Sequence, residues 1–88
     1  MPNDWDDIIR KAAKSTNAHF AEQLSGLTRL TNADIEGLIM DSGISREDLA
    51  DTLQLVKDAG KSNGEKAAAI RNIQKGVDVL VNLVGKLI

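Results

Sequence analysis

The chain has 88 residues, a formal net charge of −2, 42% hydrophobic residues and 27% charged residues. This length gives room for a single core, and the charged content is that of an ordinary globular domain, which argues against disorder. The absence of cysteine excludes disulfides, thiolate metal sites and thiol nucleophiles. With one Trp and one Phe as the only aromatic residues, the core must be built from Leu, Ile, Val and Ala. We therefore predict one all-α domain over residues 1–88.

The first predicted helix covers residues 4–24. Apolar and small side chains recur along it at helical spacing, at Trp5, Ile8, Ile9, Ala12, Ala13, Thr16, Phe20 and Leu24. Three aspartates lie in its first turn, where carboxylates complement the helix dipole. Ser25 and Gly26 are expected to end it, because glycine can adopt the left-handed conformation at a helix C-terminus.

The next two predicted helices are short and cover residues 32–42 and 46–59. Thr31 precedes the first and Ser45 the second, and each has an acidic residue three positions later, which is typical of a helix N-terminus. A glycine follows closely at each end. Helices of this length are marginally stable alone, so we expect both to pack on the longer helices.

The last predicted helix covers residues 63–87. The sequence Ser62-Asn63-Gly64-Glu65 has the complete Ser-x-x-Glu capping box that starts a helix. Apolar residues then alternate steps of three and four, at Ile70, Ile73, Val77, Leu80, Val84 and Leu87. Taken together, the four segments predict a compact bundle of four helices with long first and last members and a short middle pair.

The apolar stripe of this last helix is the predicted interface. Its face is wider than one helix–helix contact needs, and Gly76 beside it allows another backbone to approach. The predicted interface residues are Ile70, Ile73, Val77, Leu80, Val81, Val84 and Leu87, whereas Val79 and Leu83 are placed outside the stripe. The alternative is that the face is wholly internal and only deepens the core. We favour self-association, because a small domain gains most by burying such a face in a symmetric contact.

Two other classes of function remain open. Residues 35–53 have the rhythm of a helix-turn-helix that binds DNA, with the turn at residues 43–46. The second helix of that unit carries Glu47, Asp48 and Asp51 against Arg46 alone, and such carboxylates would face phosphates. Residues 76–88 resemble in composition an amphipathic helix that lies on a membrane, but their flanking charges are mixed. We therefore expect neither a nucleic-acid nor a membrane partner.

No constellation of residues predicts catalysis. His19 is the only histidine, and one histidine with the nearby Glu22 cannot form a closed metal site or a catalytic triad. No signal peptide and no apolar run long enough to span a bilayer is visible. We predict a non-catalytic cytoplasmic protein without cofactor or metal that forms a homodimer or higher oligomer. Its acidic part, residues 1–56, is a possible contact for another protein.

Overall fold

The structure is a computed structural model that describes residues 4–58 and 60–87, and the side chains of residues 5–58 and 60–83. Over these residues the fold is all-α, as predicted, with six α-helices, one short 3-10 helix and no strand. In chain order they are α1 (Asp4–Lys11), η1 (Ala12–Lys14), α2 (Asn17–Ser25), α3 (Asn32–Ser42), α4 (Arg46–Lys57), α5 (Asn63–Arg71) and α6 (Gly76–Leu87). The prediction of four helices is wrong, because each of the two long helices is divided.

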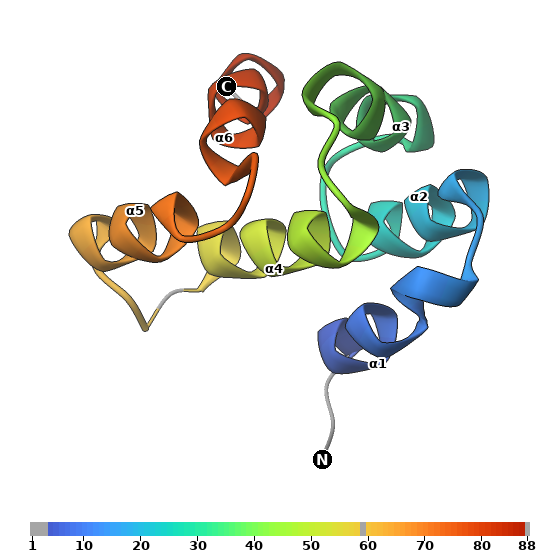
Figure 1. Cartoon of the computed structure of the whole chain (residues 1–88), viewed down its shortest axis with the longest axis horizontal. Helices are drawn as coiled ribbons and strands as arrows, with labels where there is room; N and C mark the ends of the chain where they lie inside the picture. Colours follow the sequence, from blue (N-terminus) through green and yellow to red (C-terminus); the bar gives the residue numbers. More distant parts are fainter. Residues whose placement is uncertain (1–3, 59, 88) are drawn as a thin grey trace.

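The helices lie in stacked layers (Figure 1). α3 and α6 pack side by side in one layer, α2 and α4 form the next, and α1 lies beneath α4. α5 extends beyond the end of α4 and meets α6 at a corner. α4 is the central element, since it contacts α1, η1, α2, α5 and α6.

The predicted helix 4–24 is interrupted at Ser15 and Thr16, and this is the first correction. Ser15 has an extended backbone, and its hydroxyl donates a hydrogen bond of 3.2 Å to the carbonyl of Ala12. Thr16, which the periodicity had assigned to the apolar stripe, is the N-cap of α2 and accepts a 3.1 Å hydrogen bond from the backbone N–H of His19. Short hydroxyl side chains compete with helical hydrogen bonds in this way, and two in succession end one helix and begin the next.

The predicted helix 32–42 is confirmed in its bounds by α3. The Thr31 hydroxyl accepts from the Asp34 N–H, and the Asp34 carboxylate accepts from the Thr31 N–H, each at 3.2 Å, which completes the capping box. Gly43 ends the helix in the left-handed conformation, with φ of 72°. α4 begins at Arg46 after the Ser45 cap, as predicted, and ends at Lys57.

The predicted helix 63–87 is interrupted by a turn at residues 72–75, and this is the second correction. On one straight helix Ile70 and Val79 would point about 180° apart, so that helix would need neighbours on both sides to bury both side chains. With the turn, the two side chains are 2% and 0% exposed. Lys75 adopts a positive φ of 69° within it. Gly76 follows, where an added Cβ would lie 2.6 Å from the carbonyl oxygen of Ile70.

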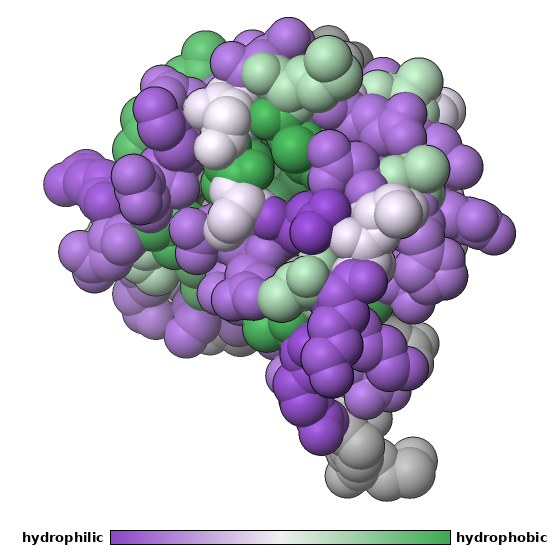
Figure 2. Space-filling view, turned by 45° about the vertical axis from the view of Figure 1, so that its right-hand side comes forward, coloured by the Kyte–Doolittle hydropathy of each residue, from purple (hydrophilic) through white to green (hydrophobic). Residues whose placement is uncertain are grey.

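The described buried side chains form one main hydrophobic cluster. Its largest fully buried members are Phe20, Leu24, Ile35, Leu38, Leu49, Leu53, Val79 and Leu83. Figure 2, which brings the α1–α3 side of the molecule forward, shows hydrophilic side chains over most of that face and apolar ones inside a hollow. Arg46 of the central helix α4 makes two hydrogen bonds to this side of the molecule. Its Nε donates to the carbonyl of Ala12, and a terminal guanidinium nitrogen donates to the Asn17 side chain, each at 2.8 Å.

Candidate interaction surface

One side of α6 is buried against the rest of the chain. Val79 and Leu83 are 0% and 1% exposed, and Gly76 lies on the same side. These three positions fall within an arc of about 60° around the helix axis. Neighbouring helices α3, α4 and α5 pack on α6. The close approach expected at Gly76 is present, but the backbone that approaches it is that of the same chain, at Ile70.

The opposite side of α6 is apolar and uncovered. Val77 is 48% exposed and Val81 is 68% exposed. At about 100° per residue they lie some 160–200° from Val79, directly opposite the buried arc. Leu80 lies between the two sides and is half-buried. Among the described side chains of α6, the exposed polar ones are Asp78 and Asn82, which occupy a separate narrow arc, so apolar residues cover the larger part of the circumference described.

The predicted interface residues therefore divide into three groups. Ile70 is buried, and Ile73 is partly buried against the hydrophobic cluster. Val77, Leu80 and Val81 lie at the surface to different extents. The predictions for Val84 and Leu87 fall on side chains outside the described set. Val79 and Leu83, which the prediction placed outside the apolar stripe, lie on the buried side of α6, away from Val77 and Val81.

A further exposed apolar residue was not singled out from the sequence. Met40 on α3 is 79% exposed, and α3 packs beside α6 in the same layer (Figure 1). The sequence did hold a signal for it. Ile35, Leu38 and Ile39 lie within about 100° of one another on a helix, and Met40 lies outside that arc.

Two helices joined by a turn, α3 and α4, occupy the region of the predicted helix-turn-helix, but the second of them is the central helix of the fold. α4 buries Leu49, Ala50 and Leu53 under several neighbouring helices. The guanidinium of Arg46, the cation expected to meet phosphate, hydrogen bonds to Ala12 and Asn17 instead.

The outward positions at the start of α4 carry negative charge. Glu47 is exposed, and Asp48 and Asp51 are half-buried. Burial raises the pKa of Asp51 above its ordinary value, and the negative charges of Asp48 and Glu47 raise it further. This surface would repel a phosphate backbone rather than bind one.

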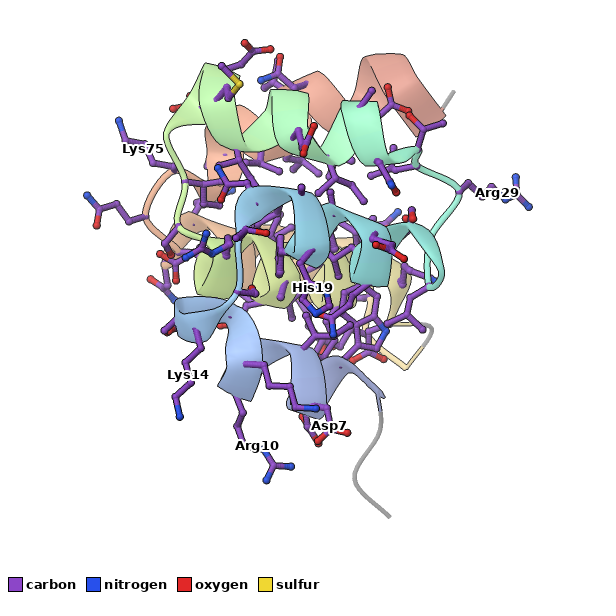
Figure 3. All side chains as sticks on the ribbon, turned by 90° about the vertical axis from the view of Figure 1, so that its right-hand side faces the viewer. Asp7, Arg10, Lys14, His19, Arg29 and Lys75 are labelled. Atoms are coloured by element: carbon purple, nitrogen blue, oxygen red, sulfur yellow. The ribbon has the colours of Figure 1, made fainter. Side chains whose placement is uncertain are left out.

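Catalytic and metal-binding arrangements do not emerge from the described residues. His19 is exposed on α2, at the N-terminal turn capped by Thr16 (Figure 3). In residues 4–58 and 60–87, no three His, Cys, Asp or Glu side chains come together in a group that could hold a metal ion. The helices of this described part are also too short or too polar for any of them to cross a membrane.

Comparison with known proteins adds no further constraint on the site. No protein-family model, no curated protein and no solved structure matches this chain. The candidate surface therefore rests on the geometry of α6 and α3 alone.

Proposed function

We propose that this protein is a non-catalytic helical interaction module that self-associates through the outward face of α6. The observation that carries the proposal is the exposure of Val77 and Val81 directly opposite the buried residues Val79 and Leu83. A helix that is apolar on both sides is expected to be covered on both sides. The described residues cover only one side of α6, so the other is open to a partner.

The partner that best fits this face is a second copy of the chain. In a two-fold contact the same patch meets itself, so an apolar patch on one copy is matched without any other component. Valines and a leucine, rather than charged groups, lie at the centre of the exposed face. Such a face can pack against the same face of a second copy without bringing like charges together. For an 88-residue domain, intermolecular burial adds to a core of limited size.

The size of this face indicates a weak contact. Val77, Leu80 and Val81 are already partly buried, so each contributes roughly 1 kcal/mol when covered, which gives about 6 kcal/mol for two copies. Association costs at least about 4 kcal/mol in lost translational and rotational freedom. The surplus of about 2 kcal/mol corresponds to a Kd of roughly tens of millimolar, and the contact is tighter if Met40 on the neighbouring helix takes part.

Sedimentation equilibrium over a concentration series up to about 5 mM tests this proposal, because a Kd of roughly tens of millimolar leaves roughly a fifth of the chains in dimers at the highest concentration. The wild-type chain should show reversible dimer formation, and Val81→Asp should remain monomeric across the series. Circular dichroism should show that Val81→Asp keeps its helix content, because Val81 makes little contact within one copy. A wild-type chain that stays monomeric at the highest concentration would contradict the proposal.

Met40→Asp is the matched control for the position of the contact. It introduces the same charge at another exposed apolar residue, on α3 instead of α6. We expect a smaller effect on the dimer than that of Val81→Asp. Equal loss of the dimer in both variants would place the contact across both helices, and loss in Met40→Asp alone would rule out the α6 face.

The DNA-binding alternative has less support. Its expected recognition helix, α4, is the central element of the fold, and its outward N-terminal positions are acidic. DNA binding would become the better proposal if a duplex-DNA column retained the wild-type chain and raised salt released it. Retention should then be lost in Arg46→Glu and kept in Arg71→Glu. Binding of the α6 face to vesicles, abolished by Val81→Asp, would instead favour a membrane-peripheral protein.

A further inference from the structure

A surface cleft of about 470 Å³ lies between the loop that joins α2 to α3 and the C-terminal half of α4. Leu30 and Leu53 form its deepest part, since they are 4% and 2% exposed. Leu27 and Val56, both half-buried, line its sides. The cleft is therefore apolar over most of its depth. Its size falls in the range of roughly 300–1,000 Å³ that small-molecule sites occupy.

The ammonium of Lys57 lies at the rim of this cleft. Lys57, the last residue of α4, lines it and donates a hydrogen bond to the backbone carbonyl of Leu27. Its ammonium is also 5.8 Å from the centre of the Trp5 ring. An ammonium has three donors, so two remain after the bond to Leu27.

Within the described side chains, residues 5–58 and 60–83, no carboxylate forms an ion pair with this ammonium, and the ion pair found there joins Arg10 and Asp7 on α1. Arg29 also contributes to the lining, but its side chain extends away from the body of the molecule (Figure 3). Lys57 is therefore the charge that a ligand in the cleft would meet first.

We propose that this cleft binds a small organic carboxylate that carries an apolar chain. The apolar side chains Leu27, Leu30, Leu53 and Val56 would cover the chain, and the Lys57 ammonium would pair with the carboxylate at the rim. Such a ligand would contact both the apolar lining of the cleft and the Lys57 ammonium. An apolar molecule without charge would leave Lys57 unpaired, and a phosphate or a metal ion would leave the apolar lining unused.

The cleft is separate from the proposed self-association face. Its lining comes from residues 26–30 and from the end of α4, whereas the self-association face lies on α6. Ligand binding and dimer formation can therefore fail independently, and the Val81→Asp monomer should bind the ligand as the wild-type chain does.

Titration with octanoate tests the proposal, because Trp5 is the only tryptophan and lies close to Lys57. We expect a saturable change in its fluorescence, together with amide shifts confined to residues 26–30 and 53–57 in a ¹H–¹⁵N spectrum. Hexanoate, which is two methylenes shorter, should bind about tenfold more weakly. Acetate, which has the charge without the chain, should give no saturable change.

Two variants separate the charge from the apolar lining. Lys57→Met keeps the length of the side chain but removes the charge, and it should weaken octanoate binding by about threefold, as loss of an exposed ion pair does. Lys14→Met on η1 removes a lysine at a distance from the Arg29 loop (Figure 3) and should leave binding unchanged. Val56→Thr adds a hydroxyl to the wall at nearly constant shape and should weaken octanoate binding several-fold while the fold persists.

The proposal is overturned by any of four results. The first is an amide-shift pattern spread over the molecular surface, the second is equal affinity for hexanoate and octanoate, and the third is equal weakening by Lys57→Met and Lys14→Met. Binding by the wild-type chain that Val56→Thr leaves unchanged would also contradict it. Each of these readouts is independent of the oligomeric state.

Discussion

The helices α4 and α6 each have 12 residues and bury apolar side chains, but their outward faces differ. Neighbouring helices surround α4, and the positions that remain outward at its start are acidic. α6 has neighbours on one side, and its opposite side carries Val77 and Val81. A charged outward face is stable in water, whereas an apolar one gains from a partner. The comparison teaches that the number of packed sides of a helix does not identify an interface. An interface is indicated by apolar side chains on the uncovered side.

The sharpest test of the two sides of α6 is a matched pair of truncations. Leu83→Ala should lower the free energy of unfolding by about 2–5 kcal/mol, because it opens a cavity in the core. Val81→Ala should change it by about 0.5 kcal/mol or less, because that side chain is 68% exposed. Urea unfolding at low protein concentration, where the monomer dominates, measures both. Equal effects would mean that the two faces are not distinct.

The corner before α6 can be tested with a pair of glycines. Gly76→Ala places a Cβ 2.6 Å from the carbonyl oxygen of Ile70, so we expect a loss of about 1–3 kcal/mol in unfolding free energy despite the higher helix propensity of alanine. Gly37→Ala on α3 meets nothing within 4 Å and should stabilise the protein by up to about 1 kcal/mol. Thermal unfolding followed by circular dichroism should give opposite signs. Stabilisation by both would disprove the close approach.

The attachment of α4 to the first part of the chain depends on Arg46. Arg46→Met should cost about 1–2 kcal/mol of unfolding free energy, because two charge-assisted hydrogen bonds at 2.8 Å are lost. The Ser15 hydroxyl still donates to the carbonyl of Ala12, which limits the loss. Arg71→Met, at the exposed end of α5, should change the stability by less than about 0.5 kcal/mol in the same denaturant series. Equal losses would show that the two hydrogen bonds contribute nothing specific.

The smallest expected effect concerns the acidic face of α4. Burial, together with Asp48 and Glu47, raises the pKa of Asp51 above its ordinary value of 3.8, so the folded state binds this proton more tightly than the unfolded chain. The contribution of Asp51 to stability therefore falls as the pH rises from about 3.8 through the raised pKa. Asp51→Asn should gain stability relative to the wild type over that interval and keep a constant advantage above it.

Carboxyl ¹³C shifts measured through a pH titration check the cause directly. Asp48→Asn should move the pKa of Asp51 back toward its ordinary value, because it removes one of the negative neighbours. An unchanged pKa of Asp51 in that variant would assign the shift to burial and Glu47.

The sequence predicted best the elements that local chemistry defines. The start of α3 follows from the Thr31 and Asp34 capping box, and its end follows from Gly43, so its predicted bounds match the structure. Ser45 and Ser62 likewise cap α4 and α5 as expected. Gly26 follows the end of α2 as predicted, but in the right-handed conformation, with φ of −68°.

The interruptions of the two long helices could not be derived from apolar periodicity. Between Ile70 and Leu87 the steps of three and four continue without a break, yet the chain turns at residues 72–75. Val79 is buried within the main hydrophobic cluster and Ile70 outside it, so the division depends on packing between helices, which apolar periodicity does not report. The unfavourable glycine at position 76 was the available signal, and its interpretation as an interface feature was incorrect. Val77 and Val81 were among the predicted interface residues, but their position together on the exposed side of α6 is known only from the structure.

The position of Arg46 directly after the Gly43 turn has a consequence for the order in which the chain opens. The left-handed conformation of Gly43 sets the direction in which α4 begins, and that direction brings the Arg46 guanidinium to Ala12. Loss of the turn should therefore release η1 and α1, more than 30 positions earlier in the chain, before the α3 and α6 layer opens. We expect the amide protons of α1 to exchange with solvent faster in Gly43→Ala, and those of α6 to keep their protection.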